Sequence, residues 1–203
     1  MQNRLQIALA ITCCILALLA SCAETPPSTV FRTAYSIPAN HPGFRNILVI
    51  GVAGDFESRA LFEQQLVAAI AGETVTATPY FAVVGRRPML TRTALRTAIR
   101  AREFDAVILT RQQGQEKEEL APLRPVGGQF DLFDYDYAEL NLDVSIAQAP
   151  AITFVTEMYS AVAEEKVWSI NSLSFDKATA TDLINEQALM IAAQLKKDGL
   201  LAR

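Results

Sequence analysis

The chain has 203 residues, 51% of them hydrophobic, with 18 basic and 22 acidic residues and a formal net charge of −4. This length supports one domain with a sizeable core, and the weakly acidic balance does not indicate nucleic-acid binding, which calls for a basic stripe. The single histidine, His41, lies in a linker-like stretch, which nearly excludes Ser-His-Asp or Cys-His catalysis, and one histidine cannot form a zinc site with several histidines.

The first 21 residues have the layout of a secretion signal. Arg4 is their only charged residue, and an apolar run follows from residue 5 to residue 19. A short positive region, an apolar run and then small residues are typical of a signal peptide. The run is shorter than the roughly 20 apolar residues that a membrane-spanning helix needs. We therefore predict a signal peptide at residues 1–21.

The run ends in the motif LASC at residues 19–22, which resembles the lipobox of bacterial lipoproteins. The resemblance implies cleavage before Cys22 and attachment of palmitate-like acyl chains to that cysteine. Ala23 then follows the lipidated residue, and the absence of aspartate there points to the outer membrane, with the domain on the periplasmic face. An ordinary signal peptide cleaved near Ala20, or an uncleaved anchor, is the alternative.

Cleavage before Cys22 has a consequence for thiol chemistry. Cys13 and Cys14 would leave with the signal, and the lipid would occupy the third cysteine. Of the 203 residues, removal of 21 leaves a mature chain of 182 without a free thiol. Because Arg4 is the only charge removed, the formal charge becomes −5. We expect no disulfide and no thiolate metal site in the mature domain.

Residues 22–45 carry four prolines among small polar residues. Proline without periodic apolar residues predicts an extended tether that connects the lipidated Cys22 to the domain. An edge strand over residues 30–37 is the alternative for part of this stretch.

The first part of the domain predicts alternating strands and helices. Residues 46–53 form an apolar, β-branched run that suits a strand buried on both faces. Asp55 can cap the following helix. The apolar stripe of that helix would be Phe62, Leu66, Ala69 and Ile70, with Glu57, Arg59, Glu63 and Gln64 largely off it. Residues 74–84 predict a second strand, in which Pro79 indicates an edge or a bulge.

A second helix and a third strand follow. Thr91 suits the N-cap of the helix, and Leu90 can pack on Leu95 as a hydrophobic staple. Leu95, Ala98 and Ile99 would face inward, whereas Arg92, Arg96, Arg100 and Arg102 would face solvent. Residues 105–110 predict the third strand. Residues 111–149 give no clear pattern, and we expect a long loop or a loosely packed hairpin there.

The remainder predicts a β-hairpin and a terminal helix. The strands would be residues 151–161 and 166–175, with Trp168 and Ile170 on one face. The helix would span residues 178–198, and Gly199 fits the left-handed position of a Schellman motif. The order β-α-β-α-β followed by a hairpin and a helix predicts an α/β fold with helices on a mixed sheet, formed by one domain over residues 46–203.

The chain resembles a family of small bacterial lipoproteins of unassigned function. Besides the lipobox, the resemblance lies in four segments: NILVIGVAG, LTRTALRTAIRAREFDAVILTR, the hairpin TEMYSAVAEEKVWSINSLSF and the closing KKDGLL. In this family a turn glycine is usual where the present chain has Glu164 and Glu165, which leaves the turn type open. The layout is more distantly similar to the TolB amino-terminal domain, the curli secretion lipoprotein and lipoprotein activators of penicillin-binding proteins. These are assembly or binding modules, and the likeness is an analogy of architecture.

Two segments are candidate sites. Residues 51–55 join a strand to a helix and could bind phosphate, but they lack the third glycine of a dinucleotide fingerprint and the lysine of a P-loop. A tight turn with a helix cap is the simpler interpretation. The acidic segment, residues 129–143, interleaves acids with aromatic residues and fails the calcium-loop pattern. It is either a solvated loop or a partner-binding patch whose residues would be Phe133, Tyr135, Tyr137, Asp134 and Asp136.

These observations favour a lipid-anchored, non-enzymatic module of the cell envelope that binds another envelope component, most simply a protein. The alternative is a carboxylate-dependent hydrolase of peptidoglycan or another glycan, in which two acids would stand about 5 Å or 6.5–9.5 Å apart. No cofactor and no metal are predicted, and Trp168 is expected in the core as the structural alternative to a ligand platform.

Overall fold

The computed structural model describes residues 28–35, 41–52, 55–86, 89–112, 140–141, 151–175 and 179–203. Its main sheet has six described strands in the order β1-β8-β7-β5-β2-β3. Their bounds are β1 Thr29–Tyr35, β2 Asn46–Gly51, β3 Thr76–Pro79, β5 Ala106–Gln112, β7 Ala151–Ser160 and β8 Glu165–Phe175. Strand β2 runs parallel to β3 and β5, and the remaining neighbours are antiparallel. The predicted mixed sheet is confirmed.

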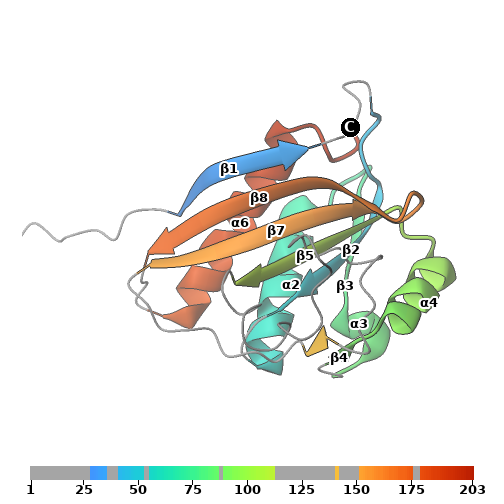
Figure 1. Ribbon diagram of the computed structural model, residues 1–203, viewed down its shortest axis with the longest axis horizontal. Helices are drawn as coiled ribbons and strands as arrows, with labels where there is room; N and C mark the ends of the chain where they lie inside the picture. The colour runs from blue at the N-terminus through green and yellow to red at the C-terminus, as the bar shows by residue number, and fades with distance from the viewer. Residues whose placement is uncertain are drawn as a thin grey trace, which may run out of the picture.

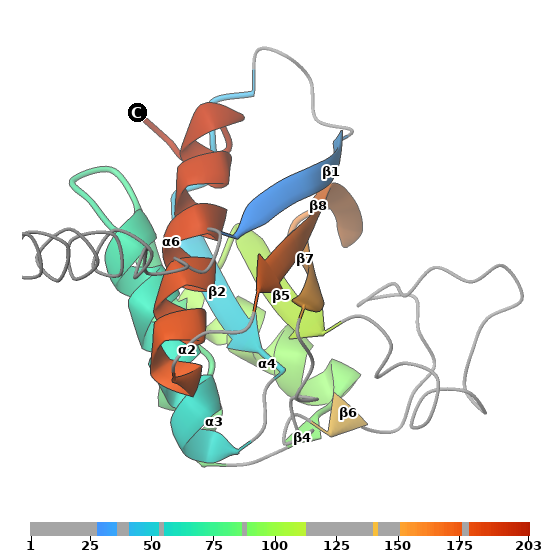
Figure 2. The ribbon, with the colours of Figure 1, turned by 90° about the vertical axis from the view of Figure 1, so that its left-hand side faces the viewer.

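Helices cover both faces of this sheet (Figures 1 and 2). The long helices α2 (Phe56–Ile70) and α6 (Ala180–Lys197) lie side by side on one face, and α4 (Arg92–Arg102) lies on the other. The short helix α3 (Phe81–Val84) follows β3. A separate two-stranded pair joins β4 (Met89–Leu90) to β6 (Leu140–Asn141). None of the helices in the described ranges is long and apolar enough to span a bilayer.

The central strands are buried on both faces, as their continuous apolar runs predict. In β2, Ile47 and Val49 pack towards α2 and α6, whereas Leu48 and Ile50 pack towards α4. All of these side chains have no solvent exposure. Each aliphatic side chain removed from water in this way contributes about 1.5–3 kcal/mol, so these strands supply a large part of the core.

Local capping residues set the helix ends where the sequence predicts them. Asp55 Oδ1 accepts a hydrogen bond from Ser58 N–H (2.7 Å), and Thr91 Oγ1 accepts one from Ala94 N–H (3.1 Å). Gly199 adopts φ +71° after α6. The two hydrogen bonds satisfy backbone N–H groups that the helices leave unpaired. The positive φ of Gly199 allows the chain to turn at the end of α6.

The end of α6 forms the predicted Schellman motif. Leu200 N–H donates to Leu195 O (3.1 Å) and Gly199 N–H donates to Lys196 O (3.2 Å). Leu195 and Leu200 are both buried in the core cluster beneath α2 and α6. The motif therefore turns the chain and buries the residue that follows the turn.

Two segments differ from the expected layout. Residues 74–84 do not form one strand: β3 ends at Pro79 and α3 begins at Phe81, so the prediction of a strand over the whole stretch is wrong. Pro79 lacks an N–H group, so continuation of the strand is disfavoured. The edge position that this proline indicated is confirmed, because β3 is the last strand of the sheet.

The second difference concerns residues 22–45, which we expected to be a tether. Strand β1 pairs antiparallel with β8 at the edge of the sheet, which is the alternative that we considered for residues 30–37. Val30 packs against the main core cluster, so its burial holds the strand on the sheet. Phe44 is also buried, and its N–H group donates to Leu200 O (2.7 Å).

Candidate functional site

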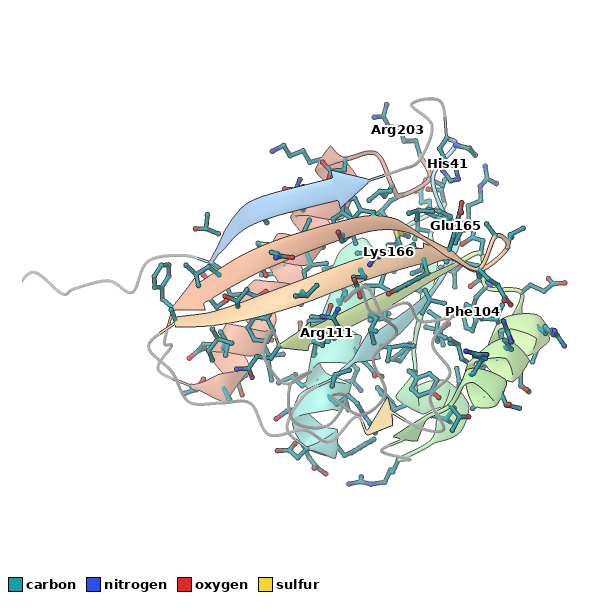
Figure 3. All side chains as sticks on the ribbon, viewed as in Figure 1. His41, Phe104, Arg111, Glu165, Lys166 and Arg203 are labelled. Carbon is teal, nitrogen blue, oxygen red and sulfur yellow. The ribbon has the colours of Figure 1, made fainter. Side chains whose placement is uncertain are left out.

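Four polar side chains meet on the α4 face of the sheet, where β5, β7 and β8 run side by side. The Glu157 carboxylate of β7 forms ion pairs with two cations: Arg111 Nη2 lies 3.1 Å from Oε2, and Lys166 Nζ lies 2.9 Å from Oε1. The Tyr159 hydroxyl also donates to Oε2 (3.0 Å). Figure 3 shows Arg111 on β5 and Lys166 on β8, on either side of β7. The strand register explains the meeting, because Glu157 lies opposite Leu109 of β5 on the same face.

This cluster is largely buried, although the Lys166 side chain keeps 21% exposure. The side chains of Arg111 and Glu157 are 8% and 5% exposed. A buried carboxylate without a counter-charge costs several kcal/mol, and a buried ion pair recovers that cost only with good geometry and further hydrogen bonds. Here two cations and a hydroxyl share one carboxylate, so the cluster fixes the relative position of three strands.

A second buried carboxylate lies on the opposite side, at the end of β2. Glu63 of α2 accepts a hydrogen bond from Gly51 N–H at Oε1 (3.1 Å) and one from Phe81 N–H at Oε2 (3.0 Å). Burial raises the pKa of Glu63 to about 7, although these hydrogen bonds and the nearby Arg59 guanidinium act in the opposite direction. Both side chains have no solvent exposure, so Glu63 links β2, α2 and α3 from inside the protein.

Gly51 permits the close approach that makes this contact possible. A Cβ atom at this position would lie 2.9 Å from Phe62 Cδ1, which is closer than real Cβ contacts. Without a side chain at residue 51, the helix lies near enough for Glu63 to reach the strand. Our expectation that Arg59 and Glu63 lie off the buried stripe of the helix is wrong, because α2 is enclosed by more than the sheet.

A row of arginines follows one face of α4. Arg92, Arg96 and Arg100 are spaced four residues apart, about 6 Å along the helix axis. Glu164 faces this row: Arg96 Nε donates to its Oε1 (3.0 Å) and Arg96 Nη2 donates to its Oε2. The hydrogen bonds from Arg96 lower the pKa of Glu164, with smaller contributions from Arg92 and Arg100. The burial of Leu95 and Ala98 on the opposite side of α4 is confirmed.

The same contact resolves the open question of the hairpin turn. Residues 161–164 connect β7 to β8, and Glu164 adopts φ +52°, a conformation that usually favours glycine. The bidentate contact with Arg96 holds the Glu164 side chain at this position. Val162, at the tip, is 86% exposed. The turn therefore presents an apolar tip beside the arginine row.

An apolar pocket opens between α2, α6 and the sheet. Its lining residues are Val52, Phe62, Thr110, Phe154, Leu183, Ile184 and Gln187. The pocket is small, with a cavity volume of about 20 Å³, which is room for roughly one water molecule. Ser172 Oγ donates to Gln187 Oε1 (3.0 Å), and Gln187 also contacts Ser174, so the amide at the pocket wall is engaged with the sheet.

The structure does not test the residues that we predicted for lipidation and partner binding. Cys22, and the patch of Phe133, Tyr135, Tyr137, Asp134 and Asp136, lie outside the described residues. Within the described ranges, no group of three or more His, Cys, Asp or Glu side chains is placed to hold a metal ion.

Two other expectations concern described residues. Trp168 is 1% exposed, in agreement with its predicted place in the core. At residues 51–55, the expected helix cap is confirmed: Asp55 caps α2, and the Gly51 N–H is bound to the Glu63 carboxylate. An anion bound there would meet these two acidic groups.

Sequence reasoning missed both buried carboxylates. The signal for Glu157 is an acid in the middle of the apolar strand ITFVTEMYS, where an unpaired charge would be costly. The signal for Glu63 is weaker, because Arg59 and Glu63 at a spacing of four residues are equally typical of a solvent-exposed ion pair.

The sequence matches no protein-family model and no curated protein. Among solved structures, the chain is similar to the PelC dodecamer from Paraburkholderia phytofirmans, with TM-score 0.45 and 13% identity over 87% of this chain and 99% of that one. It is also similar to lipoprotein GNA1162 from Neisseria meningitidis, with TM-score 0.36 and 11% identity over 74% and 96% of the two chains. Likeness at this level gives no ground for transferring an activity.

Proposed function

We propose that this protein is a lipid-anchored lipoprotein of the cell envelope, attached through Cys22 to the outer membrane on its periplasmic face. The observation that carries the proposal is the LASC motif, which stands where the apolar run of the N-terminus ends. Acyl chains on one cysteine anchor a protein firmly, because each buried methylene contributes about 0.8 kcal/mol and two or more chains act together.

We further propose that the domain acts without catalysis, by binding another protein of the envelope. The two buried carboxylates of the described part support this role. Glu63 and Glu157 are each engaged in contacts that hold secondary-structure elements together. The partner-binding surface that we propose from the sequence is the acidic segment, through Phe133, Tyr135 and Tyr137, with Asp134 and Asp136 as an acidic rim for a basic surface.

The anchor is tested by replacing Cys22 with serine in cells fed a clickable palmitate. We expect loss of label and accumulation of the unprocessed precursor. Replacement of Cys13 by serine is the matched control, because that residue lies within the signal and should leave labelling unchanged. Undiminished labelling of the Cys22→Ser protein would contradict the proposal.

The non-catalytic role is tested with purified peptidoglycan. We expect no release of soluble fragments on incubation with the purified lipoprotein. Release that is abolished by Asp134→Asn or Asp136→Asn would instead assign the protein to the hydrolases.

A further inference from the structure

The start of β1 lies close in sequence to the proposed lipid anchor. Ser28 is hydrogen-bonded on the folded domain: its N–H donates to Glu186 Oε1 (3.1 Å) and its hydroxyl donates to Glu186 Oε2 (2.6 Å). Only residues 23–27 separate it from Cys22. Six Cα–Cα steps at full extension span about 20 Å. The link between lipid and domain is thus far shorter than a tether that extends to residue 45.

The elements that share this end of the domain can be identified from the strand pairing. Thr29 of β1 lies opposite Leu173 of β8, and Ala151, the first residue of β7, lies opposite Phe175. The start of α6 is at the same end, because Leu183 packs with Ile152 and Phe154 of β7. Figure 1 shows the starts of β1, β7 and α6 together. Around this end, Ala151 and residues 179–182 are exposed.

The opposite end carries the hairpin turn and α4. Strand β8 has 11 residues, so it is about 35 Å long from the turn to Phe175. That length exceeds the roughly 20 Å reach of the link. The residues that follow Cys22 include Pro26 and Pro27 directly before Ser28. Proline favours an extended, semi-rigid chain, which would continue outward from the end at which β1 begins.

Resting on the proposed lipid anchor, we propose that the domain stands on its membrane with the Ser28 end against the lipid headgroups and with the β7–β8 turn and α4 facing away. Of the exposed described residues at this end, which are Thr29, Ala151 and residues 179–182, only Asp182 is charged. Val162 and the arginine row of α4 then form the surface presented to the periplasm.

An inverted or flat arrangement is the competing possibility, since arginines near an anionic leaflet contribute about 1 kcal/mol each. Two features oppose it. The guanidinium group of Arg96 is already bound to Glu164. The exposed carboxylates of Glu103, at the end of α4, and of Glu165, at the end of the turn, add negative charge beside the arginines. The net attraction of this end for anionic lipid is therefore small.

The orientation is tested on the acylated full-length lipoprotein in vesicles of phosphatidylethanolamine and phosphatidylglycerol. Single cysteines are introduced as Thr181→Cys and Val162→Cys, both at exposed positions, and are labelled with a fluorophore. Lipids that carry a nitroxide on the headgroup then quench nearby dyes. We expect quenching at residue 181 to exceed that at residue 162 several-fold. Equal quenching, or stronger quenching at residue 162, would overturn the proposal.

A spacer variant separates the effect of the link from intrinsic membrane affinity. Twenty Gly/Ser residues inserted between Pro27 and Ser28 add a flexible chain of about 25 Å root-mean-square length. We expect the difference between the two positions to shrink. An unchanged difference would show that the domain binds lipid by itself and would overturn the role of the link. Failure of the anchor itself is distinguishable, because that protein would lack palmitate label and would not float with the vesicles.

Discussion

Glu63, in the middle of α2, holds the first residue of α3 in place: its Oε2 accepts a hydrogen bond from Phe81 N–H at 3.0 Å. The other oxygen is bound to Gly51 N–H. One side chain therefore connects the end of a central strand to the short helix that follows the edge strand. The connection is made in an environment that disfavours the charged form of the carboxylate.

This environment predicts a pH-dependent stability. The folded protein retains the proton of Glu63 up to about pH 7, whereas the unfolded chain releases it near 4.5. The stability that the proton contributes is fully present below pH 4.5 and is lost as the pH rises through 7. The largest expected contribution is about 3 kcal/mol. Urea unfolding at pH 5 and pH 8 should show this loss for the native protein and a smaller one for Glu63→Gln.

Glu57→Gln is the matched control, because Glu57 lies on the exposed side of the same helix and pairs with Arg86. We expect it to retain the pH dependence of the native protein. If Glu63→Gln showed the same pH dependence as the native chain, this carboxyl would not be the group that titrates.

Gly51→Ala is expected to destabilise the fold by about 1–3 kcal/mol, because the new Cβ would lie 2.9 Å from Phe62 Cδ1 and would push α2 away from β2. Gly72→Ala is the control, since no atom lies within 4 Å of the corresponding Cβ. Thermal unfolding followed by circular dichroism compares the two variants. Equal melting temperatures would contradict the close contact.

Trp168→Phe is expected to lower the free energy of unfolding by about 2 kcal/mol. Trp168 Nε1 donates to Asp198 Oδ2 (2.8 Å), and this bond ties β8 to the end of α6. Asp198→Asn keeps an acceptor at the same place and should cost less. Denaturant titrations of the three proteins measure the difference, and a larger loss for Asp198→Asn would show that the charge, rather than the hydrogen bond, stabilises this end of the helix.

The acidic segment supplies the functional prediction. We expect replacement of Phe133, Tyr135 and Tyr137 by serine to weaken capture of the partner by crosslinking in native membranes, because aromatic anchors dominate binding energy at interfaces. The melting temperature should stay nearly unchanged. Loss of folding in this triple variant would show that the aromatic residues belong to the core and have no special role in binding.

Several features follow from the sequence alone because they depend on neighbouring residues. The caps at Asp55 and Thr91 and the Schellman motif at Gly199 depend on a few adjacent backbone groups. The inward stripe of α6 also follows from local periodicity: Ile184, Ala188, Ile191 and Leu195 are all buried. The prediction of lipidation at Cys22 likewise depends only on the LASC motif and does not require knowledge of the fold.

Other features were decided only by the tertiary structure. Periodicity reports which side of a helix is apolar, but it does not report how many neighbours enclose that helix, so Arg59 and Glu63 became buried against expectation. The Glu157 cluster needs side chains from three strands up to 55 residues apart in sequence, brought together by the sheet register. The short link between Cys22 and the domain likewise depends on the pairing of β1 with β8, a contact between opposite ends of the chain that local sequence patterns do not encode.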